Sequence, residues 1–232
     1  MFTFQTADYL ALAFFGLAWL AYHVFVEGAQ ARRGGLNQLM DHYRLRWMDE
    51  MAQREVRVVD SSIIASLQNG TAFFASTSLL VIGAAATLLR ATDDVLKLFS
   101  DLPFGLVTTR PLWEVKVIGL GVIFGYAFFK FSWSYRLFNY SAILIGATPA
   151  AHDPDQTRRR RTAWHAGQMN ITAARHFSRG QRAFFFALGY IGWFISPYVL
   201  IGTTLFILGV MFTRQFASDA RAAVVGNPPP LD

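Results

Sequence analysis

One stretch of the sequence, from Trp113 to Pro149, most constrains what the chain can fold into. Its first half has the length and apolarity of a membrane span, and Gly119, Gly121 and Gly125 would let another helix approach it closely. Its second half keeps a helical pattern of apolar residues but becomes polar and aromatic, with Lys130, Trp133, Arg136, Asn139 and Tyr140. The stretch therefore predicts a transmembrane helix that leaves the bilayer and continues as a polar helix.

The composition is that of a small polytopic membrane protein. Hydrophobic residues make up 53% of the chain and charged residues 16%, compared with roughly 25% charged residues in soluble domains. The net charge of +6 comes mostly from arginines in two loops, so it predicts membrane topology and not nucleic-acid binding. The chain has no cysteine, which excludes disulfides, cysteine-ligated metal centres and thiol catalysis.

Four apolar runs are long enough to cross a bilayer, which takes about 20 helical residues. We expect spans at about 7–26, 71–89, 114–134 and 183–212, which together form an all-α, four-helix transmembrane bundle in a single membrane domain. Pro197 interrupts the last run and predicts a kink in that span. The first run follows no basic segment and precedes no small-residue cleavage site, so it predicts a retained span and not a signal peptide.

Two long hydrophilic segments, at about 27–61 and 135–182, lie between these spans. In the first, apolar residues recur at a spacing of four, which predicts an amphipathic helix that either lies on the membrane surface or packs on another helix: Leu39, Tyr43, Trp47 and Met51. The second segment also has a helical pattern from about Arg158 onward. We expect amphipathic helices in both loops to extend the bundle, and the proline-rich tail at about 217–232 to be disordered.

The distribution of arginine predicts the orientation in the membrane. Both hydrophilic segments are rich in arginine, whereas the connection between the second and third spans has few basic residues and the segment before the first span has none. Because basic loops stay on the cytosolic side, we expect both long loops in the cytosol and both termini outside, in the periplasm. The predicted location is the bacterial cytoplasmic (inner) membrane.

Three separated stretches resemble one family: residues 66–83 (SLQNGTAFFASTSLLVIG), 129–149 (FKFSWSYRLFNYSAILIGATP) and 176–194 (HFSRGQRAFFFALGYIGWF). The chain is similar in these stretches to the bacterial and plant membrane proteins grouped as domain-of-unknown-function family 599 (DUF599). The resemblance covers most of the chain and implies a four-span integral membrane protein. It implies no catalytic residues.

A group of polar residues should gather near the cytosolic membrane boundary: Asn69, Lys130, Arg136, Asn139, Tyr140, Arg175, Arg179 and Arg182. Small and polar residues also share one face of the second span, namely Ser62, Ser66, Asn69, Phe73, Ser76, Leu80, Gly83 and Thr87. If this face packs against the third helix, Asn69 meets Arg136 and Asn139 in a polar site that could hold an anionic lipid headgroup or a small anion. In the alternative interpretation, these arginines only anchor the topology by binding lipid phosphates.

His23 and Glu27 lie four residues apart at the cytosolic end of the first span. Ionisable groups at membrane depth are often functional, so a proton relay is one interpretation, and a hydrogen-bonded pair that ties this helix to a neighbour is the other. A haem site would need two histidines within spans, whereas only His23 is in one, and no histidine and carboxylate cluster has the spacing of metal ligands. We therefore expect no metal and no cofactor.

The sequence contains no phosphate-binding loop, dinucleotide fingerprint, GxSxG elbow or HExxH motif, so nothing in it predicts an enzyme. Two functions are left open. The first is a non-enzymatic scaffold or accessory subunit that binds lipid or protein through its cytosolic helical layer, and the second is a small oligomeric channel or transporter for an anion or small solute. The expected partners are the lipid bilayer, in particular anionic phospholipid, and either further copies of the chain or a larger membrane complex. Nucleic acid is not expected.

Overall fold

The computed structural model describes residues 4–100 and 109–225 of the chain. Every regular element within these residues is a helix, so the fold is all-α, as the sequence predicts. The elements are α1 (Thr6–Arg33), α2 (Leu36–Met51), α3 (Val58–Arg90), α4 (Thr92–Ser100), α5 (Arg110–Gly146), α6 (Gln156–Ile191), the 3-10 turn η1 (Gly192–Phe194), α7 (Pro197–Phe216) and α8 (Asp219–Val225).

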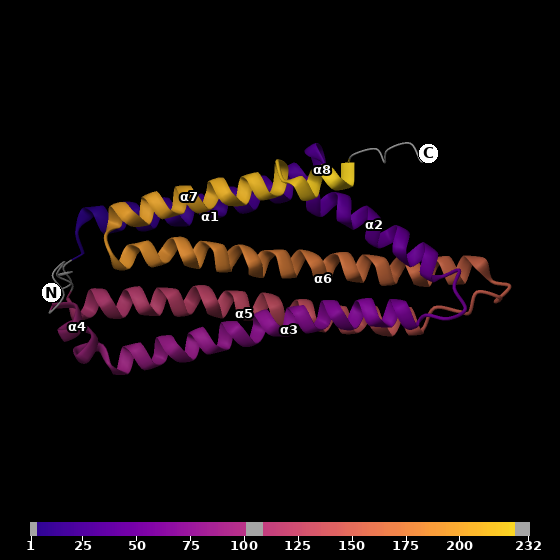
Figure 1. The fold of residues 1–232 in the computed structure, drawn as a ribbon, viewed down its shortest axis with the longest axis horizontal. Coiled ribbons are helices and arrows are strands. Elements are labelled where there is room, and N and C mark those ends of the chain that lie inside the picture. Colours follow the sequence, from indigo (N-terminus) through magenta and orange to yellow (C-terminus); the bar gives the residue numbers. More distant parts are fainter. Residues whose placement is uncertain (1–3, 101–108, 226–232) are drawn as a thin grey trace.

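The central pair of a long helical bundle is formed by α5 and α6 (Figure 1). On one side of this pair α3 packs against α5, on the other α1 and α7 pack together beside α6, and α2 crosses obliquely over α6. Small residues let α5 and α6 approach each other closely. The hydroxyl of Ser134 donates to the carbonyl oxygen of Ala173 at 2.7 Å. Gly180 lies directly against the ring of Phe131, which is fully buried.

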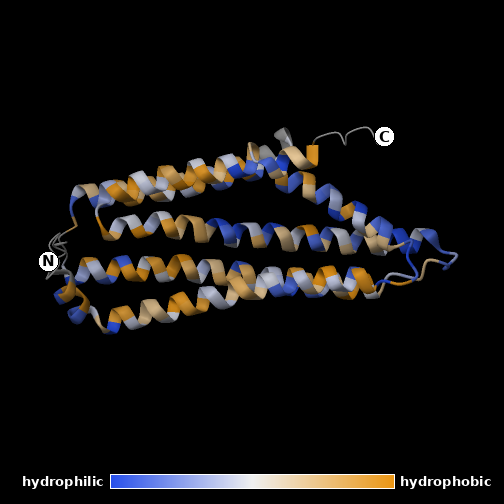
Figure 2. Ribbon diagram, in the orientation of Figure 1, coloured by the Kyte–Doolittle hydropathy of each residue, from blue (hydrophilic) through white to orange (hydrophobic). Residues whose placement is uncertain are grey.

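Four stretches are long and apolar enough to cross a membrane, as expected of an integral membrane protein: Thr6–Gly28, Val58–Arg90, Arg110–Gly146 and Pro197–Val225. The 37 residues of α5 correspond to about 55 Å of helix, almost twice the ~30 Å hydrocarbon core of a bilayer. Figure 2 shows that apolar residues concentrate toward the end of the bundle where α4 lies, and hydrophilic residues toward the connection between α5 and α6. The bundle therefore has an apolar end and a hydrophilic end.

The fourth predicted span, 183–212, is not one helix. Instead α6 ends at Ile191, and α7 begins at Pro197 after the turn η1. The Ser196 hydroxyl accepts the backbone N–H of Val199 at 3.1 Å and so caps α7. Pro197 therefore starts a helix, where its missing N–H costs nothing, and does not kink one. The hydroxyl of Thr203 donates to the carbonyl of Gly189 at 2.7 Å, which shows that α7 folds back on α6.

Because α7 reverses direction after α6, it runs parallel to α1. At the apolar end the indole N–H of Trp193 donates to the carboxylate of Asp8 at 2.8 Å, and farther along Tyr22 donates to the carbonyl of Met211 at 3.1 Å. The beginning of α1 consequently lies at the apolar end of the bundle, whereas α8 lies farther along it, beside the start of α2 (Figure 1). The apolar half of α6, about 183–191, is a fifth apolar segment alongside the four long stretches. The prediction that both termini lie on one side of the membrane stays a prediction.

The predicted disorder of the tail, at about 217–232, is wrong for residues 219–225, which form α8. The Ser218 hydroxyl accepts the backbone N–H of Arg221 at 3.2 Å. The Arg221 side chain in turn donates to the carbonyl of Gly34 at 3.3 Å, so the short helix is held against the end of α1. The remainder of the predicted tail, 226–232, lies outside the described residues.

The first hydrophilic segment forms α2, which packs on α6. Met48 and Met51 are fully buried in this contact, and the absence of a side chain at Gly167 lets Leu45 come close to α6. The contact face is thus centred one position away from the predicted stripe, and Tyr43 of that stripe is 49% exposed. Of the two arrangements open from the sequence, α2 adopts the one in which it packs on another helix.

The face of α3 that was predicted to pack is the exposed face. All eight of its residues, from Ser62 to Thr87, are exposed, and the opposite face is buried. The buried positions recur every seven residues at Ile64, Thr71, Ser78 and Ala85. Two of these are hydroxyl residues whose side chains donate to the helix's own carbonyls at 2.7 and 2.8 Å, which removes the cost of burying them.

The substitution Gly180→Ala should destabilise the protein although alanine is the better helix former. The added Cβ would lie 2.7 Å from the ring of Phe131, which is fully buried and has no room to move. Overpacking of this kind costs about 1–3 kcal/mol, which exceeds the roughly 1 kcal/mol gained in helix propensity. The matched control is Gly209→Ala, where a Cβ meets no atom within 4 Å. Thermal unfolding in detergent should show a lower Tm for Gly180→Ala only; equal behaviour of the two variants would contradict the packing.

Candidate anion-binding cavity

The structure does not bring the whole predicted polar group together. Arg136 is exposed on α5, where its Nε donates to the hydroxyl of Tyr140 at 2.7 Å and its guanidinium lies over the same ring. Asn139 accepts a hydrogen bond from Gln68 at 2.5 Å. Asn69, the next residue on α3, is exposed on the outer face and so does not meet Arg136 or Asn139.

Lys130 also lies apart from the other predicted cations. Its ammonium is 5.1 Å from the centre of the Tyr126 ring, one turn earlier on α5. A cation over an aromatic face is a favourable contact that needs no carboxylate. Lys130 is therefore satisfied within α5.

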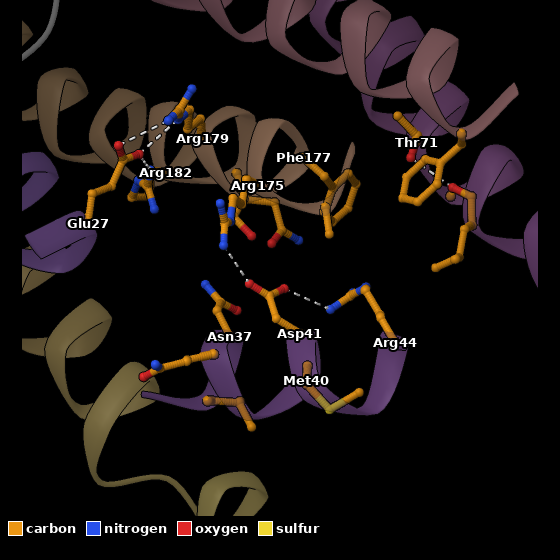
Figure 3. A pocket seen from close by; sticks show the side chains of 18 of the residues that line it. Glu27, Asn37, Met40, Asp41, Arg44, Thr71, Arg175, Phe177, Arg179 and Arg182 are labelled. Atoms are coloured by element: carbon orange, nitrogen blue, oxygen red, sulfur yellow. Dashed lines mark hydrogen bonds and ion pairs between the residues drawn. The ribbon is translucent and has the colours of Figure 1, made fainter. Parts of the chain in front are cut away.

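The three predicted arginines of α6 do gather, and they line a cavity of about 610 Å³. Arg175, Arg179 and Arg182 occupy one side of α6 because they are four and three residues apart. Residues of α2 and α3 form the two walls, and Glu27 of α1 closes one end (Figure 3). The cavity lies where the first candidate span ends, at the border between the apolar and hydrophilic ends of the bundle.

A left-handed glycine positions α2 beside the cavity. The chain leaves α1 through Gly34, whose φ of 57° is a conformation that other residues rarely adopt. The chain then enters α2 at once, and the first turns of α2 place Asn37, Asp41 and Arg44 in the cavity wall. Asp41 and Arg44 were not among the predicted site residues. Their spacing of three on a predicted helix was the available signal.

Glu27 binds two of the three α6 arginines. Arg179 donates to both carboxylate oxygens, at 2.8 and 3.0 Å, and Arg182 donates to one of them at 3.0 Å. The predicted partner His23 is also near, with its Nδ1 3.5 Å from the carboxylate. A bidentate arginine pair is stronger and more directional than an ordinary ion pair. This geometry favours the structural interpretation of the His23–Glu27 pair, in which Glu27 ties α1 to α6.

Asp41 has the same role at the other end of the cavity. Arg175 donates to it at 3.2 Å, and Arg44 lies 3.6 Å away (Figure 3). Burial raises the pKa of Asp41, against the opposing effects of Arg175 and Arg44. Burial also lowers the pKa of Arg44. The charges at this end are thus partly shielded from water, where electrostatic interactions are stronger than on an open surface.

The cavity lining has the chemistry of an anion site. Four guanidinium groups face two carboxylates, so its formal charge is +2. Each carboxylate is shared by two arginines, which leaves hydrogen-bond donors available to a ligand. The remaining lining mixes apolar residues, including Met40, Leu67 and Phe177, with polar ones such as Asn37 and Gln181. Among the described residues, no group of three or more histidine and carboxylate side chains could hold a metal ion.

Over residues 10–220 the sequence matches the family described as "Protein of unknown function, DUF599". The chain belongs to this family. The resemblance seen in three stretches of the sequence is therefore confirmed, and the matched range includes every charged residue of the cavity. No curated protein and no solved structure matches the chain.

The substitution Glu27→Gln should lower stability because it leaves Arg179 and the largely buried Arg182 without a carboxylate. We expect a loss of roughly 1.5–3 kcal/mol, the range for hydrogen bonds to charged groups. Glu114→Gln is the control, since Glu114 pairs with Arg110 on the surface and such pairs contribute about 0–1 kcal/mol. The free energy of unfolding in mixed detergent should be lower for Glu27→Gln than for Glu114→Gln. A Glu27→Gln protein as stable as wild type would show that the contact between Glu27 and the two arginines is dispensable.

Proposed function

We propose that the protein is a non-enzymatic scaffold or accessory subunit of the bacterial cytoplasmic membrane that binds the headgroup of an anionic phospholipid in its arginine-lined cavity. The observation that carries this proposal is the position of the cavity. Four arginines surround a space of about 610 Å³ at the border between the apolar and hydrophilic ends. Lipid phosphates lie at that depth in a bilayer, and the cytosolic leaflet is the one rich in anionic lipid.

The same distribution of arginine supports an orientation with the hydrophilic end in the cytosol. The N-terminal end of α1 is then periplasmic, and α8 is cytosolic because α7 runs parallel to α1. The chain crosses the membrane five times in this arrangement, with the apolar half of α6 as the short fifth crossing. One side of that half packs against the other helices, where Ala183, Phe186 and Tyr190 are buried, and Leu188 and Ile191 are exposed on its other side.

A phospholipid headgroup fits the donors of the cavity. Arginine presents a planar fork that matches phosphate oxygens, and it holds its charge at any physiological pH. Arg175 and Arg44 share the carboxylate of Asp41, which already balances part of their positive charge. A phosphate can therefore accept hydrogen bonds from both guanidinium groups without the burial of an unbalanced positive charge. Arg44 and Asp41 are largely buried, and contacts to partly buried charges are stronger than contacts on an open surface.

A channel or transporter formed by several copies is the second candidate, and the exposed polar face of α3 favours it. Within one copy, the apolar end is filled by Phe131, Phe186 and Trp193, each at most 1% exposed. A pore would therefore have to run between copies, lined by α3 residues such as Ser76 and Thr87. Movement of an anion or small solute into liposomes that contain the purified protein would favour this function over the scaffold.

Anionic lipid should stabilise the wild-type protein, and the double variant Arg44→Ala/Arg175→Ala should lose that effect. The test compares the rise in Tm that phosphatidylglycerol causes in detergent with the rise caused by phosphatidylcholine. Arg136→Ala is the control because Arg136 is an exposed arginine outside the cavity. Each variant serves as its own baseline, so a change in starting stability does not confuse the result. An undiminished lipid effect in the double variant would reject the cavity as the binding site.

The substitution Asp41→Asn should strengthen lipid binding, because it removes a carboxylate that competes for Arg175 and Arg44. A gain of about 1 kcal/mol, at the upper end for a partly exposed ion pair, corresponds to roughly fivefold tighter binding. Asp93→Asn provides the control, since Asp93 is an exposed partner of Arg110. The measurement is the dissociation constant for phosphatidylglycerol, determined for each of the two variants and for the wild type. Weaker binding by Asp41→Asn would mean that the ordering of the two arginines by Asp41 outweighs its competition with the ligand.

A further inference from the structure

One face of α6 continues from the cavity toward the apolar end of the bundle. It carries Phe177, Gln181, Phe184 and Leu188, whose spacings of four, three and four residues place them on the same side of the helix. The first two line the cavity. Phe177, Gln181 and Phe184 are half-buried and Leu188 is 56% exposed, so the face is most open at the end that the bilayer would surround.

Aromatic rings make this face a connected apolar surface. Phe74 of α3 contacts both Phe177 and Phe184, with 5.6 Å between the ring centroids in each pair. Behind these rings lies the fully buried Phe131, which stacks on Phe74 at 5.3 Å. Phe177, Phe74 and Phe184 are each only half-buried, and we call them the aromatic strip. The strip begins in the wall of the cavity and ends at membrane depth.

The size and charge of the cavity constrain the head of a ligand. A volume of about 610 Å³ falls in the range of roughly 300–1,000 Å³ typical of sites for whole small molecules, and a single inorganic anion would leave most of it empty. The net charge of the lining is +2. A phosphomonoester carries about −1.5 to −2 at pH 7 and balances this charge better than a singly charged phosphodiester does.

We propose that the cavity and the aromatic strip are the head and tail halves of one site for a lipid phosphomonoester. The phosphate lies among Arg44, Arg175 and Arg179, and a hydrocarbon chain runs along the strip to Leu188. The proposal rests on the proposed function and adds a ligand class to it. It differs from ordinary headgroup contact because the chain of the lipid is bound by the protein, in a defined place, together with the phosphate.

Two glycines of α3 allow the site to be blocked with a matched control. Gly70 lies in the cavity wall beside the strip, and a Cβ added there meets no atom within 4 Å. Gly83 is equally open but lies outside the cavity. Gly70→Phe therefore adds a ring in the cavity wall beside the strip from a backbone position with room for a side chain, whereas Gly83→Phe adds the same ring elsewhere on the same helix.

The experiment titrates the full-length protein in detergent micelles with three probes and measures bound lipid by native mass spectrometry. The probes are dioleoyl phosphatidic acid, dioleoyl phosphatidylglycerol and sn-glycerol 3-phosphate. We expect the phosphatidic acid to bind the wild type most tightly and glycerol 3-phosphate to bind much more weakly. Gly70→Phe should weaken binding of phosphatidic acid by about tenfold or more, equivalent to 1.4 kcal/mol, and Gly83→Phe should not.

A second pair of variants tests the tail half without changing the cavity. Leu188→Gln places a polar group on the exposed end of the proposed chain path, and Leu80→Gln places one on the exposed outer face of α3. Leu188→Gln alone should weaken binding of phosphatidic acid, and neither variant should change binding of glycerol 3-phosphate. If Gly70→Phe fails to fold, this pair of variants still shows whether the hydrocarbon chain binds along the strip.

The outcomes separate this inference from the proposed function. If both lipids bind through Arg44 and Arg175 but Gly70→Phe and Leu188→Gln bind as wild type does, the tail half is overturned and the headgroup site stands. Equal or tighter binding of phosphatidylglycerol overturns the preference for a phosphomonoester, and equally tight binding of glycerol 3-phosphate overturns the lipid as ligand. If no probe binds through the arginines, the proposed function fails as well.

Discussion

The carboxylate of Glu27 is the contact on which the border between the two ends of the bundle depends. It accepts three hydrogen bonds from two arginines of α6, and so it fixes the end of α1 to the middle of α6. Charged side chains at this depth are costly when unpaired. With Glu27 in place, Arg182 can lie directly before the apolar residues that begin at Ala183. The short fifth segment of the bundle thus depends on one acid from the first helix.

The same pairing shapes the cavity. Because Glu27 holds Arg179 and Arg182 at one end and Asp41 holds Arg175 and Arg44 at the other, the four guanidinium groups are kept apart and oriented before any ligand arrives. Preorganised donors lose less entropy when they bind an anion than mobile surface arginines do. Glu27 and Asp41 therefore reduce the net positive charge of the cavity, but they keep the four arginine side chains in fixed positions.

The parts of the fold that could be predicted from the sequence are those that depend on local pattern. The helical class, three of the long apolar helices and the helix at α2 follow from periodicity and length. The break after Ile191 could not be predicted this way, since apolar residues continue on both sides of a five-residue turn and hydropathy does not register a reversal of direction. Pro197 was one local signal, and a proline has the same appearance at a kink and at a helix start. Ser196, a common helix-capping residue type, was the other.

The candidate site was predictable in its charges but not in its geometry. The arginines of α6 were identified from spacing and sign. Their true partners, Glu27 and Asp41, come from elements more than 130 residues earlier in the chain. Which face of α3 packs was also not decided by pattern, because small hydroxyl residues occur on both faces. Such residues donate to the helix's own carbonyls on the buried face, at Thr71 and Ser78, and on the exposed face, at Thr87. Placing Asn69 on the packed side led to the expected meeting with Arg136.

The contacts of α1 also set the order in which the protein can be completed during synthesis. Glu27 cannot form its ion pair until Arg179 has been synthesised, 152 residues later. Asp8 likewise cannot bind Trp193 until 185 further residues have been added. At about 5–20 residues per second, the first helix spends roughly 8–30 seconds with neither acid able to meet its distant partner. Its retention in the membrane during that interval rests on apolar length alone. The first helix to be made is therefore among the last to reach its native position, and its docking closes the bundle around α6 and α7.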